Sequence, residues 1–377
     1  ALEELVAQRL SLRQLNIRRM RSRATPLKDV NKLVPQLRSQ LPFVLTSAQE
    51  TALDDILSDI ATVVPMHRLL QGDVGSGKTI VAAIAALVSA SAGSQTGFMA
   101  PTELLVEQHF SNLCDWLRPL GIEVVRLTGA VMGPARSKVL SSIAAGQAQV
   151  VVGTHALFQQ GVQFRKLALM IVDEQHRFGV HQRLKLKQKG QKGVLSPHQL
   201  VMTATPIPRS LALTQYGDME VSILDEKPPG RKPIKTAILS TERMSEVVDH
   251  LRRAIAEGRQ CYWVCPLVEE SEVMDLTAAD ERFKRLRAVL GDDVVGLVHG
   301  QMPPAEKDAA MAAFQEGRTR VLVATTVIEV GVNVPNASIM VIERAEIFGL
   351  AQLHQLRGRV GRGTAQSTCL LMYQPPL

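Results

Sequence analysis

A glycine-rich segment has the residue types and spacing of a phosphate-binding loop. Residues 72–79 read GDVGSGKT and match the pattern GxxxxGK[ST], directly after an apolar run and before a helical pattern. Glycines let backbone N–H groups turn toward phosphate oxygens, and a helix start adds positive potential. We expect Lys78 to reach the β- and γ-phosphates of a nucleotide and Thr79 to ligate Mg²⁺. The predicted nucleotide-binding residues of this loop are Gly72, Asp73, Val74, Gly75, Ser76, Gly77, Lys78 and Thr79.

Two carboxylates end an apolar run about 95 residues after Lys78. In open parallel sheets, ligands bind at the carboxyl ends of the strands, where Asp173 and Glu174 would stand. Asp173 is therefore expected to complete the Mg²⁺ site, and Glu174 to polarise the attacking water. An acidic pair taken alone is more typical of a solvated loop start. The preceding phosphate loop favours the catalytic interpretation.

An arginine- and glycine-rich segment, QLRGRVGRG at residues 355–363, is a poor helix and a poor core. A guanidinium group is planar and always protonated, which suits charge that develops on a transferred phosphoryl group. Gln355, Arg359 and Arg362 are therefore candidate catalytic residues. The alternative is an arginine loop that binds nucleic acid and has no part in triphosphate chemistry.

Short polar turns follow many of the expected strands. Their hydroxyls and backbone N–H groups suit sugar–phosphate contacts without base readout, although each turn alone is typical of a helix cap. Aromatic residues are only 4% of the chain, which disfavours binding by base stacking. The recurrence of these turns predicts a nucleic-acid track made of Pro101, Thr102, Thr128, Gly129, Thr154, His155, His299, Gly300, Thr325 and Thr326.

From residue 67, apolar runs alternate with helical patterns, which predicts an α/β protein with mainly parallel sheets flanked by helices. Prolines in DEKPPGRKP interrupt this rhythm and predict a linker. The expected domains are a basic helical arm at 1–40, a first lobe at 41–225, a linker at 226–235 and a second lobe at 236–377. The expected strands are HRLLQGD, QTGFMAP, IEVVRLTG, QVVVGTH, LALMIVDE and QLVMTATP in the first lobe, and TAILS, QCYWVCPLV, VVGLVHG, RVLVATT, SIMVIER and STCLLMY in the second.

Composition sets the class of protein. The 377 residues are 46% apolar and 21% charged, which permits a large core and excludes a disordered or collagenous chain. The net charge is +7, and residues 1–40 alone contribute nine basic and three acidic side chains. A polyanion partner is permitted, and a solvated helix face explains the basic arm as well as a DNA contact does.

The four cysteines show no metal-type spacing, which favours small buried hydrophobes in a reducing compartment. The longest apolar stretch, after Thr79, is too short for a bilayer span of about 20 residues. The chain opens with Ala1 inside a helical pattern, so we expect it to be part of a longer protein.

The ordered motifs resemble those of the superfamily-two helicases and translocases, and in detail those of the RecG-type branched-DNA helicases of bacteria. The resemblance covers nearly the whole chain and rests on LPFVLTSAQ (41–49), QGDVGSGKT (71–79), MAPTELLVEQH (99–109), VVGTHALFQ (151–159), VDEQHRFGVHQR (172–183), MTATPIPR (202–209), GLVHGQM (296–302), VLVATTVIEVGVNVPNAS (321–338) and GLAQLHQLRGRVGRG (349–363).

This resemblance implies two RecA-like lobes with ATP bound between them, preceded by a helical arm from a wedge domain. Phe43 and Gln49 fall where the family contacts adenine. Gly331 and Arg359 would face the nucleotide from the second lobe, with Arg362 as the arginine finger. The residues implied to couple hydrolysis to lobe movement are Gln175, His176, Thr203 and Thr205.

The resemblance also implies ATP and Mg²⁺ as cofactors, and duplex and branched DNA (stalled forks and Holliday junctions) as the substrate in recombination and repair. It further implies a monomer in the bacterial cytoplasm at the nucleoid, with a single-stranded-DNA-binding protein as a partner. Asn333 departs from the family's GVDVPNA, and we expect a weaker ribose contact with activity retained. The family's wedge domain would precede residue 1 and its translocation hairpin would follow Leu377.

Other protein classes share some of these motifs. The translocase module of a transcription-repair coupling factor shares HRFGV and QLHQLRGRVGR, but Gln175 and the VEESE stretch favour the RecG type. DEQH and TATP disfavour a DEAD-box RNA helicase. A module that binds DNA and uses ATP only to set lobe orientation is opposed by the intact catalytic residues. The basic run 165–192, with eight cations and two acids, is expected to line the duplex path or to form a solvated helix, with Lys185 and Lys187 as its test positions.

Overall fold

The chain divides into two compact units, Ala1–Lys227 and Pro228–Leu377, in the computed structural model. The division falls inside the proline-rich stretch at which the sequence predicts a linker. Each unit is described by itself. The structure describes residues 22–129, 131–159, 161–174, 195–204, 219–226, 232–266, 272–325, 334, 336–361 and 366–375.

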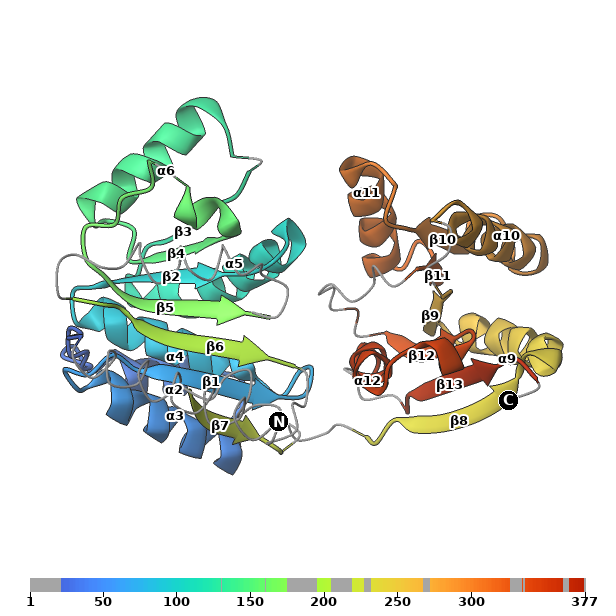
Figure 1. The fold of residues 1–377 in the computed structure, drawn as a ribbon, viewed down its shortest axis with the longest axis horizontal. Coiled ribbons are helices and arrows are strands. Elements are labelled where there is room, and N and C mark those ends of the chain that lie inside the picture. The colour runs from blue at the N-terminus through green and yellow to red at the C-terminus, as the bar shows by residue number, and fades with distance from the viewer. Residues whose placement is uncertain are drawn as a thin grey trace, which may run out of the picture. The chain divides into compact units, whose positions relative to one another are not determined.

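The first unit is built on a seven-stranded sheet with the order β3-β4-β2-β5-β6-β1-β7, and every neighbouring pair is parallel (Figure 1). Continuous apolar runs form its central strands because helices cover both faces of a parallel sheet. The predicted parallel α/β architecture is confirmed. The strands are β1 His67–Gly72, β2 Gln95–Met99, β3 Val124–Leu127, β4 Val150–Gly153, β5 Leu167–Asp173, β6 His198–Thr203 and β7 Glu220–Leu224.

Helix α4 is the central helix of this unit, and all of its residues except Thr79 are buried. Its sequence is rich in alanine, which lets the neighbouring helix and the sheet approach closely. The core on this side of the sheet joins α4 to β1, β2, β5 and α3. The helices are α2 Leu33–Gln40, α3 Ser47–Ile60, α4 Lys78–Ser91, α5 Glu103–Leu117 and α6 Gly133–Ala145.

The edge strand β7 was not expected from the sequence. Its residues alternate between apolar and polar, and Val221 and Ile223 are partly exposed, unlike the continuous runs used to predict the other strands. An edge strand has one neighbour and needs no continuous apolar run. Arg68 of β1 anchors it by donating a hydrogen bond to the Ser222 hydroxyl (2.8 Å), while its Nε lies 2.8 Å from a carboxylate oxygen of Asp59 in α3.

The described part of the predicted helical arm at 1–40 is not one continuous helix. Residues 22–32 contain no helix and end in a turn at Val30 and Asn31, so only α2 is helical. Leu27 is 1% exposed, and its N–H donates to the Ile60 carbonyl (2.8 Å), so this segment packs into the core of the first unit. Pro26 explains the non-helical chain, since a proline disfavours helical backbone at the residue before it.

The second unit contains a six-stranded sheet with the order β10-β11-β9-β12-β13-β8, again parallel throughout (Figure 1). Trp263 of its central strand β9 is fully buried. The elements are β8 Lys235–Ser240, α9 Met244–Ala256, β9 Gln260–Val264, α10 Glu272–Leu290, β10 Val295–Val298, α11 Pro304–Gln315, β11 Val321–Ala324, β12 Ala337–Ile342, α12 Leu350–Arg357 and β13 Thr368–Tyr373.

The cysteines are free thiols, and three of them are buried in the second unit. Cys261 and Cys265 lie in the core around β9, as the sequence predicts. Burial raises the pKa of Cys369 to about 11, so its thiol stays protonated at neutral pH. These side chains act as small hydrophobes. Among the described residues, no helix combines the length and the apolar composition needed to cross a bilayer.

Candidate functional site

The carboxyl ends of the strands in the first sheet meet at one edge because all the strands run in the same direction (Figure 1). The segments after β3, β4 and β2, which are neighbours in the sheet, carry Thr128, Thr154 and Thr102. The next strands, β5, β6 and β1, lead into Asp173, Thr203 and the phosphate loop. The residues predicted to bind nucleic acid and those predicted to bind nucleotide therefore occupy adjacent halves of one edge.

The loop between β1 and α4 has the backbone that phosphate binding requires. Gly75 and Gly77 have φ of 77° and 88°, a region that favours glycine. The Lys78 ammonium donates to the carbonyl of Gly72 (2.6 Å) and to that of Asp73 (3.0 Å). The lysine is thus held across the loop, with its charge beside the N-terminus of α4.

Gln49 connects α3 to this loop. Its Oε1 accepts from the Thr46 N–H (2.9 Å) in the capping box of α3, and its Nε2 donates to the Ser76 carbonyl (2.8 Å). A Cβ on Gly77 would lie 2.1 Å from Nε2, so the two residues fit only with glycine there. The residue predicted to contact adenine holds the phosphate loop in this structure. Phe43, also predicted for adenine, is 44% exposed.

Asp173 ends β5 and is 7% exposed. Its Oδ2 lies 2.8 Å from Nε2 of His109 in α5. Burial alone would raise the pKa of Asp173, but the hydrogen bond and charge of His109, the charge of Lys78 and the Glu174 N–H together hold that pKa below its usual value. The carboxyl group is therefore ionised at neutral pH. His109 ends the motif MAPTELLVEQH, and the sequence predicted no role for it.

Glu174 follows directly and has a strained backbone, with φ of 51° in the left-handed region. Its N–H donates to the Met202 carbonyl (2.9 Å), and its Oε1 accepts from the Ala204 N–H (3.2 Å). The carboxylate predicted to polarise the attacking water is thus bonded to the residue that follows β6, beside Thr203. The coupling residues Gln175, His176 and Thr205 lie outside the described residues.

The donor set of this edge fits a magnesium-bound triphosphate. The Ser76 hydroxyl is buried in the loop with no hydrogen-bond partner among the described residues, and the Thr79 hydroxyl stands in the first turn of α4. Asp173 supplies an ionised oxygen. Mg²⁺ keeps several waters and takes phosphate oxygens as ligands, so one carboxylate and one hydroxyl are sufficient protein donors for it.

The threonines of the predicted nucleic-acid track serve largely as helix caps. Thr102 caps α5 by accepting the Leu105 N–H (3.3 Å), and Thr154 accepts the Ala156 N–H (3.4 Å). Thr128 is 4% exposed. Pro101 is half-buried, whereas Gly129 and His155 are exposed beside these caps. In the first unit, the exposed residues of the predicted nucleic-acid track are therefore Gly129 and His155 in the turns. The threonine hydroxyls are less available, because they cap helices or are buried.

Arg136 of α6 joins two of these turns and was missed from the sequence. It donates through Nη1 to the carbonyl of Thr128 (3.3 Å) and that of Val131 (3.4 Å), and through Nη2 to the Gln159 side chain (3.0 Å). The turn after β3 is thereby tied to the segment after β4. No motif marks this arginine, because its role depends on two loops meeting in space.

In the second unit, His299 and Thr325 follow β10 and β11, which are neighbours in the sheet. Thr325 is 1% exposed, and Gly300 is exposed. The Lys307 ammonium donates to the Gly300 carbonyl (2.5 Å) and brings a cation to this turn. Thr326 lies outside the described residues.

The arginine-rich segment is described in part. Gln355 lies in α12, and the Arg359 N–H donates to the Leu356 carbonyl (3.0 Å) in the turn that follows. Gly361 has φ of 80°, and a Cβ there would lie 2.9 Å from the Ile234 side chain. The structure does not describe Arg362, Gly331 or Asn333.

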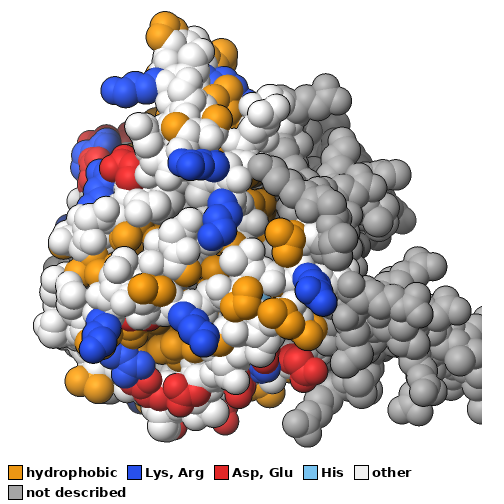
Figure 2. Space-filling model, turned by 90° about the vertical axis from the view of Figure 1, so that its left-hand side faces the viewer, with side chains coloured by type: hydrophobic (Ala, Val, Ile, Leu, Met, Phe, Trp, Pro, Cys, Tyr) orange, Lys and Arg blue, Asp and Glu red, His pale blue; other side chains and the backbone are white. Residues whose placement is uncertain are grey.

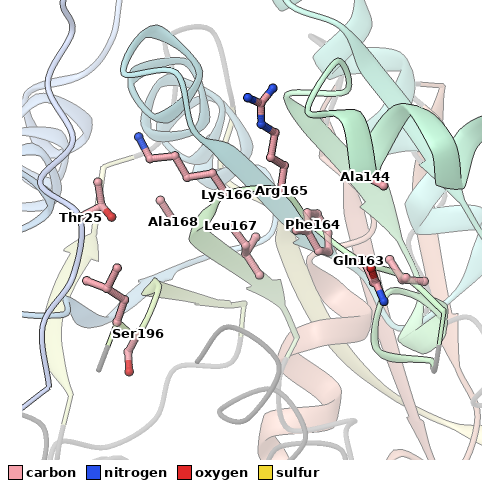
Figure 3. A pocket seen from close by; sticks show the side chains of 11 residues that line it. Thr25, Ala144, Gln163, Phe164, Arg165, Lys166, Leu167, Ala168 and Ser196 are labelled. Carbon is pink, nitrogen blue, oxygen red and sulfur yellow. The ribbon is translucent and has the colours of Figure 1, made fainter. Parts of the chain in front are cut away.

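The start of the predicted basic run lies at the amino ends of the strands, opposite the carboxyl ends that carry the predicted nucleotide and nucleic-acid residues. Arg165 and Lys166 precede β5 and line a pocket of about 670 Å³ (Figure 3). Arg165 donates to the Ala145 carbonyl (3.2 Å). Figure 2 shows this face, where cationic side chains stand apart among apolar and neutral atoms. These two residues therefore do not share an edge with the predicted nucleic-acid track, and Lys185 and Lys187 lie outside the described residues.

Comparison with known protein families gives the class of protein. A family model described as DEAD/DEAH box helicase matches residues 46–214, and one described as helicase conserved C-terminal domain matches residues 242–364. With their parallel sheets and phosphate loop, the two units form the RecA-like core of a superfamily-two helicase.

More specific relatives narrow this class. The chain is 55% identical over 377 residues to the ATP-dependent DNA helicase RecG of Escherichia coli strain K12, and 46% identical over 373 residues to that of Thermotoga maritima. A solved structure of RecG bound to a three-way DNA junction has a TM-score of 0.86 and 42% identity, and matches all of this chain and 49% of that one. The chain belongs to the RecG family of these helicases.

The matched share of the relatives is limited. The chain spans 54% of the Escherichia coli protein and 47% of the Thermotoga maritima protein. More distant structures share the fold alone, among them yeast Dbp5 bound to RNA and ADP BeF3, at 17% identity and a TM-score of 0.67.

Proposed function

We propose that this chain is an ATP-dependent DNA translocase and helicase core that remodels branched DNA such as stalled forks and Holliday junctions. The observation that carries the proposal is the adjacency of two sets of residues at one sheet edge. Nucleotide-binding residues follow β5, β6 and β1, and nucleic-acid candidates follow β3, β4 and β2. The relatives are ATP-dependent DNA helicases, and one was solved bound to a three-way DNA junction, which supports DNA as the polymer.

The first unit binds the triphosphate through its loop. Backbone N–H groups at the start of α4 and the Lys78 ammonium attract the phosphate oxygens. Asp173 and Thr79 would hold Mg²⁺, which when bound neutralises phosphate charge. Glu174 orients and polarises the attacking water, because its carboxylate stands next to Asp173 at the strand end.

Hydrolysis is coupled to movement through β6. The Glu174 side chain accepts the Ala204 N–H (3.2 Å), directly after Thr203. A change in the position of Glu174 would therefore shift the segment that begins at Thr203. We infer that this contact couples the state of the bound nucleotide to movement of the segment that begins at Thr203.

The second unit supplies the arginines. Arg359 and Arg362 would stabilise charge on the transferred phosphoryl group, with Gln355 positioned on the same segment. The turns at Gly129, His155 and Gly300 would contact the DNA backbone without reading bases. Movement of one set of turns relative to the other would step the chain along the duplex.

Finer parts of the proposal depend on the family resemblance. They are the requirement for Mg²⁺, action as a monomer at the bacterial nucleoid, and association with a single-stranded-DNA-binding protein. Sedimentation of the chain with and without such a protein tests both the monomer and the association. Titration of nucleotide binding with Mg²⁺ tests the metal.

The decisive variant is Glu174→Gln. We expect it to bind ATP with an affinity close to that of the wild type and to lose DNA-stimulated hydrolysis by about 100-fold or more, since the amide cannot accept the water's proton. Phosphate release is measured with no DNA, with linear duplex and with a forked duplex.

The matched control is Glu123→Gln, which neutralises an exposed carboxylate before β3, at the opposite edge of the sheet. This control should hydrolyse ATP at the wild-type rate. Turnover by Glu174→Gln that equals the control would defeat the catalytic assignment. Wild-type hydrolysis that no DNA stimulates would defeat the proposed motor.

A further inference from the structure

His109 contacts the carboxylate that the proposed site uses for the metal. It stands in α5 and is 6% exposed, with its Nε2 2.8 Å from Asp173 Oδ2. Its ring also packs against Phe98 of β2, with the ring centroids 4.7 Å apart. A helix and a strand that are 64 residues apart in sequence are thus joined by one buried polar contact.

A carboxylate that binds a cation is ionised and can only accept a hydrogen bond. In the metal-binding state that the proposed function requires, Nε2 of His109 is therefore the donor. The donor occupies Oδ2 and restrains rotation of the carboxylate about its last side-chain bond. The oxygen left for a cation is then Oδ1, in a fixed orientation.

A purely structural role explains this arrangement poorly. The other ring nitrogen, Nδ1, is buried and has no hydrogen-bond partner among the described residues. A buried polar atom without a partner is destabilising, so packing alone would favour an apolar side chain against Phe98. The benefit that offsets this cost lies in the contact with Asp173.

We propose that His109 is a positioning residue that holds the Asp173 carboxylate in the orientation needed to bind Mg²⁺ with the nucleotide. This inference rests on the proposed function and adds to it a residue for which the structure alone supplies the reason. Outer partners of metal ligands act in this way, and their loss typically costs 10- to 100-fold in metal affinity or activity.

The test compares two substitutions of His109. His109→Phe keeps an aromatic ring against Phe98 and removes the donor, whereas His109→Gln keeps an N–H donor of similar reach. Binding of a fluorescent ADP analogue is titrated with Mg²⁺ and is also measured in EDTA. DNA-stimulated ATP hydrolysis is titrated with Mg²⁺ in parallel.

For His109→Phe we expect the half-saturating Mg²⁺ concentration to rise about 10- to 100-fold, with nucleotide affinity in EDTA unchanged within about two-fold. His109→Gln should recover most of the wild-type Mg²⁺ dependence. If His109→Phe does not fold, His109→Asn, whose shorter amide cannot reach Asp173, takes its place.

Two outcomes would overturn the inference. One is a folded donor-less variant with the wild-type Mg²⁺ dependence. The other is an equal loss of nucleotide affinity with and without Mg²⁺, which would mark His109 as a packing residue. The binding titration does not need turnover, so it still reports on His109 if the wild-type chain fails to hydrolyse ATP with DNA.

Discussion

At the scale of single residues, the nucleotide edge is organised by groups that restrain one another. Lys78 is held by two loop carbonyls, Asp173 by His109, and Glu174 by the N–H of Ala204. These three catalytic candidates are therefore each held by defined hydrogen bonds. Preorganisation of this kind removes reorganisation from the chemical step.

Gly77→Ala tests how tightly the loop is packed. The new methyl group would lie 2.1 Å from Gln49 Nε2, at a backbone φ of 88°. We expect the variant to lose its hydrogen bond from Gln49 to Ser76 and to bind nucleotide at least 10-fold more weakly than wild type. Nucleotide affinity and the midpoint of thermal unfolding are measured together.

Gly93→Ala is the matched control, since its φ is 66° and nothing lies within 4 Å of the added Cβ. It should show the backbone strain alone, about 1–2 kcal/mol of stability, with nucleotide affinity unchanged. Equal nucleotide affinity in both variants would mean that contact between Gly77 and Gln49 does not shape the loop.

At the scale of elements, α3 links the phosphate loop to the end of the first unit. Glu226, the first residue of the predicted linker, accepts hydrogen bonds from the Ser47 hydroxyl and from the Ala48 N–H (3.2 Å) at the first turn of α3. The same turn carries Gln49, which bonds the loop. A short path of hydrogen bonds thus runs from the linker to the nucleotide site.

The hydrogen bonds from this turn to Glu226 make the stability of the folded protein depend on pH. The Ser47 hydroxyl and the Ala48 N–H hold the pKa of Glu226 below its ordinary value of 4.5. A lowered folded-state pKa adds stability above pH 4.5, and this stability is lost as the pH falls through the folded value. Glu226→Gln should therefore be less stable than wild type at pH 7, and the difference should shrink below pH 4.5.

Urea unfolding of the two proteins between pH 3 and pH 7 measures the effect. Exposed Glu123→Gln is the control and should show a smaller difference at pH 7. A stability difference for Glu226→Gln that stays constant across this range would rule out the ionised cap.

At the scale of the whole molecule, two parallel sheets with their own cores are joined through a proline-rich linker. Each unit is stabilised by its own buried strands. Binding residues stand in the first unit, and the arginines that we propose for the transition state stand in the second. The proposed motor therefore requires both.

The variant Arg362→Ala tests whether ATP hydrolysis requires the second unit. We expect ATP binding to persist, because the loop of the first unit is intact, and turnover to fall by about 10³ or more, as for loss of an arginine finger. The control is Arg357→Ala, a neighbouring arginine in the same segment, which should keep most of the turnover. Similar rates in the two variants would argue against a specific finger.

The sequence by itself determined the parallel α/β class and located the glycine-rich loop and the acid pair that we propose for nucleotide binding and hydrolysis. These features depend on local patterns, such as continuous apolar strands, glycines at fixed spacing and acids at a strand end. The edge strand β7 escaped because its alternating pattern is short. The non-helical segment at 22–32 escaped because the predicted helical arm was extended to residue 40 from an apolar stripe that ends at Leu10.

Only the tertiary structure decided which side chains hold the site. His109 reaches Asp173, Gln49 reaches Ser76, and Arg136 ties two turns, across separations of 64, 27 and up to 23 residues. Nothing in the local sequence encodes these pairs, because each depends on the order in which strands assemble into the sheet. The same order places the nucleic-acid candidates beside the nucleotide site, which spacing along the chain does not reveal.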